Sequence, residues 1–390
     1  MRKPLFFIIG ILLSGWLPAQ TFQTFIDRLM ALPENQRPVV ADSFMKTTGN
    51  FPLIDHDTLA HFIFYQPARS VKMAGDATDW QPTINLSRIP GCDLWYGTCD
   101  YEADARLDYK LVINDTSWIL DPKNPHTCMG GWGPNSELRM PAWKSPPEVN
   151  NHPGIFHGIL IDTAFHSQLL NDIHKIKIYL PHGYPDSQEA YPVVLFHDGP
   201  DYLSLGKASA VLDYLIACKM MVPVVGIFVA PVDRDPEYAG TKIDLFTRFI
   251  IEELMPFIDS RYKISKDPSK RAMVGASNGG NIALYIGMRH PEQFGRIAAQ
   301  SSNIVPVIQK YFEKGPKLNL ELYLDIGTYD IPVLIPMVRD FKKILETRKY
   351  HFEYKEIHEG HSWGNWSSHL RFPLIQFFTG SNDTPDDTKY

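Results

Sequence analysis

The chain contains 390 residues, of which 44% are hydrophobic and 21% are charged. This composition is typical of a globular protein and excludes a mainly disordered or fibrous chain. Because 44 Asp and Glu residues outnumber 38 Lys and Arg residues and the net charge is −6, the chain has no basic excess for a nucleic-acid backbone, and we expect no nucleic-acid partner.

Residues 1–20 have the pattern of an export signal. Two basic residues, Arg2 and Lys3, precede an apolar stretch from Leu5 to Leu17, and the small residue Ala19 follows. A stretch of this length is short for a membrane span. We therefore predict a signal peptide over residues 1–20, a periplasmic or secreted protein, and no stable membrane insertion once the signal is removed. A retained N-terminal anchor is the alternative.

The next region, residues 21–145, contains many short β-like segments. Between His61 and Met140, runs of aromatic and β-branched residues alternate with Gly, Asp, Asn and Pro and show no helical period. This pattern predicts a small all-β, immunoglobulin-like sandwich. The prolines in residues 146–157 disfavour both a helix and a central strand, which predicts a linker.

The four cysteines do not form a zinc-binding pattern. They include no Cys-x-x-Cys pair and no matching His spacing, so we expect no metal site, and we expect no cofactor. Cys92 and Cys99 flank a β-like segment, and an oxidising compartment would permit a disulfide between them. The sequence leaves a disulfide and two free thiols as equal alternatives.

Residues 158–380 alternate strands with amphipathic helices, of which residues 243–259 are the clearest. This pattern predicts one α/β domain with a doubly wound, mostly parallel sheet, followed by a polar tail over residues 381–390. Such sheets place their sites at the carboxyl ends of strands. The predicted strands are Lys175–Leu180, Pro192–His197, Pro223–Ala230, Arg271–Ala276, Arg296–Ser301, Leu320–Gly327 and Phe352–His358.

The segment Gly275-Ala276-Ser277-Asn278-Gly279 lies between a predicted strand and a helical run. Gly-x-Ser-x-Gly in this setting is the pattern of a nucleophile elbow, in which glycines allow a tight turn that exposes the serine hydroxyl. The bare pattern also occurs in ordinary glycine-rich turns. Because both flanking elements are present, we predict that Ser277 is a catalytic nucleophile.

A serine nucleophile needs a base, and hydrolases with this elbow supply a histidine after the last strand. His361 lies in the loop after the last predicted strand, whereas His358 still belongs to the strand pattern. The acid that orients the histidine is expected past the preceding strand. Asp330 follows that strand and is our prediction, with Asp325, inside the strand, as the alternative.

An oxyanion hole requires two backbone N–H groups. The N–H of Asn278, directly after the nucleophile, is one candidate, and the loop of residues 197–202 would supply the other. Pro200 in that loop has no N–H, so Gly199 or Asp201 would have to donate. Loss of this donor would favour an alternative function, a non-catalytic carbohydrate-binding protein on a hydrolase fold.

Residues 158–380 resemble the esterase family that includes enterochelin esterases, feruloyl esterases and esterase D. The resemblance implies an α/β-hydrolase fold and hydrolysis of carboxylic esters by Ser277, His361 and Asp330. The implied substrates are feruloyl or acetyl esters of polysaccharide, or siderophore esters, with an enterochelin-type esterase as the specific alternative. The matching segments are residues 194–199, 233–238, 252–259, 275–280, 290–295 and 359–366.

The same resemblance implies roles for three further residues near the site. Arg234 and Glu237 stand where an Arg and a Glu recur in the family, and either a substrate contact or ion pairing that holds the loop would explain them. Trp363 follows the predicted base in a segment that is most similar to the enterochelin esterase branch, which implies a contact with substrate.

The N-terminal region is similar to the glycogen-binding type of carbohydrate-binding module. In glucan-binding members, aromatic residues that match Trp80 and Trp118, with polar residues that match Lys110 and Asn135, contact sugar. Trp95 is expected in the core. Two interpretations remain at this point: a sugar-binding surface, or a buried sandwich that packs on the hydrolase and closes one side of its cleft.

Overall fold

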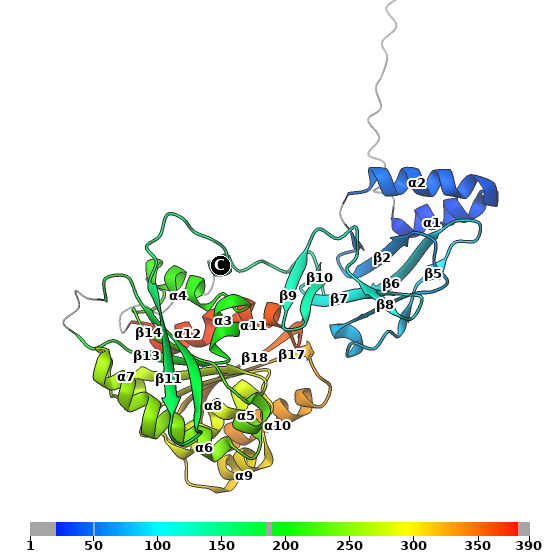
Figure 1. Ribbon diagram of the computed structural model, residues 1–390. Helices are drawn as coiled ribbons and strands as arrows, with labels where there is room; N and C mark the ends of the chain where they lie inside the picture. The colour runs from blue at the N-terminus through cyan, green and yellow to red at the C-terminus, as the bar shows by residue number, and fades with distance from the viewer. Residues whose placement is uncertain (1–20, 50, 185–188, 381–390) are drawn as a thin grey trace, which may run out of the picture.

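The computed structural model describes residues 21–49, 51–184 and 189–380. The predicted signal peptide and polar tail lie outside these residues. Figure 1 shows two bodies, an N-terminal β-rich region that carries two helices on its outer side and a C-terminal body built on a large sheet. None of the described helices has both the length and the apolar character needed to cross a membrane.

Two β-sheets make up the body of the N-terminal region. One has the order β1-β2-β6-β5, and in the other β7 pairs with β3, β8 and β10. Their inner faces bury a shared apolar core that includes Phe62, Trp95 and Tyr109, so the prediction that Trp95 is a core residue is confirmed. The strands are β1 Leu53–Asp55, β2 Leu59–Tyr65, β3 Val71–Gly75, β4 Ile84–Asn85, β5 Ser87–Arg88, β6 Leu94–Asp100, β7 Arg106–Ile113, β8 Ser117–Ile119, β9 Thr127–Gly130 and β10 Gly133–Arg139.

Helices α1 (Phe22–Ala31) and α2 (Arg37–Thr47) cover the outer face of the sheet that contains β2 and β6. The sequence prediction for this region contained no helix, although α1 buries Phe22, Phe25, Ile26 and Leu29 at helical spacing. Cys92 packs in this outer core and Cys99 packs against the core between the sheets. All four cysteines are free thiols in the structure.

The C-terminal body has the sheet order β11-β12-β14-β13-β15-β16-β17-β18. The pairs from β14 to β18 are parallel, whereas β11 and β12 run antiparallel at the edge. The predicted fold is therefore confirmed. The strands are β11 Ile159–Ser167, β12 Asp172–Leu180, β13 Val193–His197, β14 Val225–Val229, β15 Arg271–Ala276, β16 Arg296–Gln300, β17 Glu321–Tyr329 and β18 His351–Gly360.

All predicted strands are present, with bounds shifted by a few residues, and β11 was missed. Its side chains are largely exposed, with Ile159 at 60% and Leu160 at 44%, so it lacks the buried apolar run that marks the central strands. The predicted helix over 243–259 is present as α6 (Ile243–Arg248), a π-helical turn (Phe249–Leu254) and α7 (Met255–Arg261).

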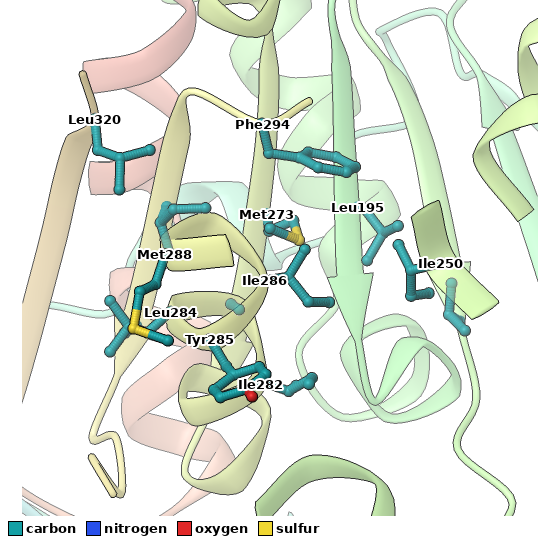
Figure 2. Packing of buried hydrophobic residues seen from close by; sticks show 14 of the residues in the cluster. Leu195, Ile250, Met273, Ile282, Leu284, Tyr285, Ile286, Met288, Phe294 and Leu320 are labelled. Atoms are coloured by element: carbon teal, nitrogen blue, oxygen red, sulfur yellow. The ribbon is translucent and has the colours of Figure 1, made fainter. Parts of the chain in front are cut away.

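Helices cover both faces of this sheet. One face packs against α6 to α10 and the other against α3, α4, α11 and α12. Figure 2 shows part of the first core, where Leu195 and Met273 of two neighbouring strands meet Ile282 and Ile286 of α8. The remaining helices are α3 Gly199–Ser204, α4 Ala208–Ala217, α5 Arg234–Ala239, α8 Asn278–Arg289, α9 Pro306–Lys314, α10 Leu334–Thr347, α11 Trp363–His369 and α12 Arg371–Phe378.

The two bodies are joined through their sheets. Arg106 at the start of β7 pairs in parallel with Glu359 near the end of β18, which extends the C-terminal sheet into the N-terminal region. The hairpin of β9 and β10 lies beside α11, as Figure 1 shows. This junction places one face of the N-terminal region at the carboxyl ends of the parallel strands.

Candidate active site

Ser277 lies on a sharp turn between β15 and α8. Its backbone has φ 57° and ψ −125°, a conformation that L-residues rarely adopt. Gly275 must be a glycine here, because a Cβ at that position would overlap the carbonyl of Gly279. The Ser277 N–H donates to Gln300 O at 2.9 Å, which ties the turn to β16. The local geometry is that of a nucleophile elbow.

His361 and Asp330 form a hydrogen-bonded pair. His361 Nδ1 lies 2.7 Å from Asp330 Oδ1, and Asp330 is 3% exposed. The alternative acid, Asp325, instead accepts the N–H of Ser301 at 3.1 Å and the amide of Gln300 at 3.3 Å. Burial raises the pKa of Asp325 to about 6. The geometry therefore favours Asp330 as the residue that orients the imidazole.

Ser277 and His361 line the same cavity of about 700 Å³. Residues from both bodies form its surface. In the described residues no hydrogen bond joins the Ser277 hydroxyl to His361; such bonds are often long before substrate binds. The other lining residues include Asp79, Trp80, Asp108, Lys110, Trp118, Gly130, Gly131, Trp132, Asn135, Asp198, Asp201, Arg234, Ile331, Ser362, Trp363 and Trp366.

The predicted oxyanion donors fall into two groups. Asn278 and Gly199 are the first residues of α8 and α3, where backbone N–H groups have no partner within the helix. Asp201 is not available, because its N–H donates to Asp198 O at 2.9 Å in the first turn of α3. The prediction that Asp201 could be an oxyanion donor is therefore wrong. Gly199 and Asn278 remain as the two candidate donors. A Cβ on Gly199 would overlap the backbone of Phe228.

Arg234 and Glu237 hold the loops around the site, but they do not pair with each other. Arg234 donates two hydrogen bonds of 2.8 Å to the buried carboxylate of Asp198, next to Gly199. Glu237 accepts the N–H groups of Val232 at 3.1 Å and Asp233 at 3.0 Å. Arg234 also lines the cavity, so holding the loop and contacting substrate are compatible.

Trp363 packs beside the base. Its ring lies edge-on to Tyr202 at 5.2 Å and to Trp366 at 5.0 Å, and the Trp366 ring lies edge-on to His361 at 4.9 Å. These contacts leave Trp363 only 9% exposed, although it lines the cavity. Aromatic packing therefore supports the imidazole from the side of α11.

The four sugar-site candidates of the N-terminal region also line this cavity. Trp118 is 44% exposed, and Trp80 is half-buried with its indole N–H 3.2 Å from Asp76. Lys110 and Asn135 lie at the same cavity, with the Asn135 amide 3.1 Å from Asp108. The two interpretations are thus not exclusive, because the surface that closes the cleft is the one that carries these aromatic rings.

The sequence interpretation missed Trp132. This residue lies between β9 and β10, is fully exposed and lines the cavity. A Cβ on Gly131 or on Gly133 would meet no other atom within 4 Å, so the Trp132 ring extends from an open hairpin tip. A tryptophan flanked by glycines in a β-hairpin is poorly placed for a core position, and this pattern could have identified it.

One cluster of possible metal ligands lies away from the cavity. In the described residues, Asp172, His174 and Glu237 each place a ligand atom within 4.8 Å of the others. His174 already pairs with Asp172 at 2.8 Å, and its other ring nitrogen lies 2.9 Å from Ala230 O. Both ring nitrogens of His174 therefore have a neighbouring oxygen within the protein.

A second cluster of buried charges lies behind His361. The Arg106 guanidinium, which is 0% exposed, contacts Asp108 at 2.6 Å, Glu137 at 2.5 Å and Glu359 at 3.8 Å. Burial raises the pKa of Glu359 to about 7, although Arg106 opposes the shift. Glu359 also accepts the indole N–H of Trp143 at 3.3 Å. The interface between the two bodies therefore contains a carboxyl group that titrates near neutrality.

We expect Glu359→Gln to stabilise the protein at pH 8 but not near pH 4. The folded-state pKa of Glu359 is about 7 and the ordinary value is 4.5. Protonated Glu359 therefore contributes its full share to the free energy of unfolding below pH 4.5, and this contribution is lost as the pH rises through 7. Glutamine mimics that protonated form, and its gain at pH 8 should be of order 1–3 kcal/mol. Urea unfolding at both pH values measures it.

The matched control is Glu346→Gln. Glu346 is exposed and pairs with Lys342 at 3.2 Å, so its replacement should change the free energy of unfolding little at either pH. Burial also raises the pKa of Asp325. Asp325 affects the free energy of unfolding equally in the parent and in the variant, so its effect cancels in the difference between them. A gain for Glu359→Gln that is equal at both pH values would contradict the titration.

The comparisons with known proteins agree with this site. A family model described as "Putative esterase" matches residues 167–377, which is more than half of the chain. The chain belongs to this esterase family. It is therefore a carboxylic-ester hydrolase, as predicted, and family membership speaks against the non-catalytic alternative.

Two curated relatives of this esterase have named activities. An endo-1,4-beta-xylanase/feruloyl esterase from Xylanibacter ruminicola is 28% identical over 281 residues, which are 68% of this chain and 38% of the relative. An iron(III) enterobactin esterase from Dickeya dadantii is 25% identical over 253 residues, which are 56% of this chain and 57% of the relative. The chain thus spans about two fifths to three fifths of the length of these two proteins.

Solved structures confirm the fold of the esterase. The enterobactin esterase from Shigella flexneri, solved in the presence of enterobactin, aligns with a TM-score of 0.73 and 21% identity, over 86% of this chain and 97% of that one. A ferulic acid esterase aligns with a TM-score of 0.51 and 21% identity, over 58% of this chain and 99% of that one. The first alignment therefore extends into the N-terminal region.

Proposed function

We propose that this esterase is a serine hydrolase in which Ser277 attacks the ester carbonyl. His361 accepts the serine proton and then donates it to the leaving alcohol, and Asp330 holds the imidazole in the required tautomer. The observation that carries this proposal is the joint position of Ser277, on its strained turn, and of the Asp330-bound His361 at one cavity.

The charge that develops on the carbonyl oxygen needs fixed donors. The N–H groups of Asn278 and Gly199 are the two we assign, each at the start of a helix beside Ser277. The Arg234–Asp198 pair holds the residue that precedes Gly199. Water then hydrolyses the acyl-enzyme by the same route, with His361 acting again as base and acid.

We propose a polysaccharide acyl ester, such as a feruloyl ester, as the substrate. Five indole rings line the cavity or its entrance, which suits flat sugar faces and an aromatic acyl group. The acidic and basic side chains that line the cavity give it no positive excess. Arg234 pairs with Asp198, and Asp108 pairs with Arg106. The lining residues that remain are two acidic ones, Asp79 and Asp201, and one basic one, Lys110. A polyanionic ferric siderophore would gain little attraction there.

The second candidate substrate is a siderophore ester. It is favoured by the structural alignment with the enterobactin esterase, which includes the N-terminal region, whereas the ferulic acid esterase aligns with 58% of the chain. Side-by-side kinetics with feruloyl oligosaccharides and with iron-loaded and iron-free catecholate esters separate the two. A higher kcat/KM for the catecholate would overturn our choice. The sequence of residues 1–20 supports export, so we propose that the enzyme acts in the periplasm or outside the cell.

We expect Trp132→Ala to weaken binding of the sugar portion. The exposed ring should contribute about 1 kcal/mol by stacking, so kcat/KM for a feruloyl oligosaccharide should fall roughly fivefold. The small ester p-nitrophenyl acetate has no sugar portion, so its kcat/KM should fall much less. The ratio of the two values is the measurement.

Phe156→Ala is the matched control for this prediction. Phe156 is 74% exposed but is not a lining residue of the cavity. Its removal should leave the ratio of the two kcat/KM values as in the parent. An equal loss on both substrates for Trp132→Ala would place Trp132 outside the sugar-binding surface.

A further inference from the structure

Among the side chains of the N-terminal region that contact the His361 loop, the buried Arg106 makes contacts on both sides of the histidine. Its Nη1 donates to the hydroxyl of Ser362 at 3.2 Å and lies 3.8 Å from Glu359. Ser362 directly follows His361, and Glu359 precedes His361 by two residues. One guanidinium from the N-terminal body therefore contacts the chain on both sides of His361.

Ser362 links this contact to the helix that follows. Its hydroxyl caps α11 by accepting the N–H of Asn365 at 3.3 Å, and the Asn365 side chain donates to Gly360 O at 2.8 Å. A displacement of Ser362 would therefore move both ends of the turn that carries His361. Arg106 itself is held by the hydrogen bonds to Asp108 and Glu137, both in the N-terminal region.

The glycines around His361 show how closely the two bodies fit. A Cβ on Gly360 would overlap the carboxyl group of Asp76, and a Cβ on Gly364 would overlap the Arg106 guanidinium. Asp76 in turn accepts the N–H of Asp108 at 2.8 Å. The backbone of the His361 turn thus lies directly against the buried carboxyl group of Asp76 and the guanidinium of Arg106, with no room for a side chain between them.

We propose that Arg106 is a positioning residue for His361, so that docking of the N-terminal region sets the orientation of the catalytic imidazole. The inference rests on the proposed role of His361 as the base. Arg106 does not line the cavity and acts through Ser362 and Gly364. The N-terminal region then has a catalytic role besides contributing cavity surface, because an imidazole shifted by about 1 Å can cost a hundredfold in rate.

Arg106→Lys tests this role, because lysine keeps the charge among the buried carboxylates but lacks the fork that reaches Asp108, Glu137 and Ser362 together. We expect kcat for p-nitrophenyl acetate to fall about ten- to a hundredfold with KM changed less than about twofold. The matched control is Arg139→Lys. Arg139 also donates to Glu137, at 2.8 and 2.5 Å, but it does not contact the His361 turn, so kcat should stay at the parent value.

A spectroscopic signature separates positioning from a general structural role. The Nδ1 proton shared by His361 and Asp330 should give a downfield proton NMR resonance, assigned by its loss in His361→Ala. In Arg106→Lys this resonance should shift or broaden while the unfolding midpoint remains high enough for a folded sample. An unchanged resonance together with an unchanged kcat would overturn the proposal.

Gly364→Ala provides an independent test if Arg106→Lys does not fold. Alanine favours a helix more than glycine does, but its Cβ would displace the Arg106 guanidinium, so kcat should fall although α11 gains helix propensity. A parent-like kcat would contradict the positioning role. Activity that survives Ser277→Ala would instead refute the proposed function, and the NMR resonance would still report whether Arg106 positions His361.

Discussion

Replacing Ser277 by Ala will lower kcat for ester hydrolysis by a factor of the order of 10⁴–10⁶. The hydroxyl is the only group that the proposed mechanism uses to form the acyl-enzyme, and its neighbours His361 and Asp330 cannot replace it. The residual rate would come from binding and from the donors of Asn278 and Gly199. The measurements are hydrolysis of p-nitrophenyl acetate and covalent labelling by a fluorophosphonate, which should attach to Ser277 in the parent alone.

The control for this variant is Ser204→Ala. Ser204 lies at the exposed end of α3, donates to Pro200 O at 2.8 Å and is not a lining residue of the cavity. Its loss should leave both labelling and turnover at the parent level. The unfolding midpoint of Ser277→Ala should stay near that of the parent, because no hydrogen bond of the Ser277 hydroxyl is lost in the described residues. Turnover that persists in folded Ser277→Ala would refute the nucleophile.

Asp330→Asn should lower kcat by about 10⁴. An amide in place of the carboxylate presents the imidazole in the wrong tautomer, so that its second nitrogen carries a proton instead of accepting one from Ser277. The 2.7 Å contact with His361 Nδ1 and the near-complete burial of Asp330 are the observations behind this magnitude.

Asp325→Asn is the matched control, because it makes the same change five residues earlier, inside β17, the strand that Asp330 follows. Asp325 accepts hydrogen bonds from Ser301 and Gln300 and does not contact His361. Since burial raises its pKa to about 6, a neutral side chain is well tolerated there, and kcat should remain close to that of the parent. A large loss for Asp325→Asn with a small loss for Asp330→Asn would reverse the assignment of the acid.

Local patterns were sufficient to predict the elements of the C-terminal body. Central strands such as β15 are buried on both faces and therefore appear as continuous apolar runs. The elbow at Ser277 could also be predicted from the sequence, because the glycines that its backbone requires lie within two residues of the serine. The edge strand β11 had no such signal, since its outer side chains contact solvent.

Only the tertiary structure distinguished groups that lie close together in the sequence. Asp325 lies inside β17 and Asp330 directly follows it, and the packing of each side chain decided which one meets His361. In the same way, Asp201 was excluded as an oxyanion donor by a hydrogen bond within α3 that depends on the turn at Asp198. A local pattern specifies the element, whereas side-chain direction and backbone partners depend on how that element packs.

The sequence by itself determined that this chain has a β-rich region, a mostly parallel α/β domain and a serine at an elbow, because these features follow from periodicity and short-range steric limits. The tertiary structure alone decided that the two bodies share one cavity, with Trp132 of the hairpin and Ser277 of the elbow on its surface. It likewise brought Arg106 to Ser362, 256 residues further along the chain. Contacts of this kind depend on the docking of complete surfaces, which leaves no local periodicity in either segment.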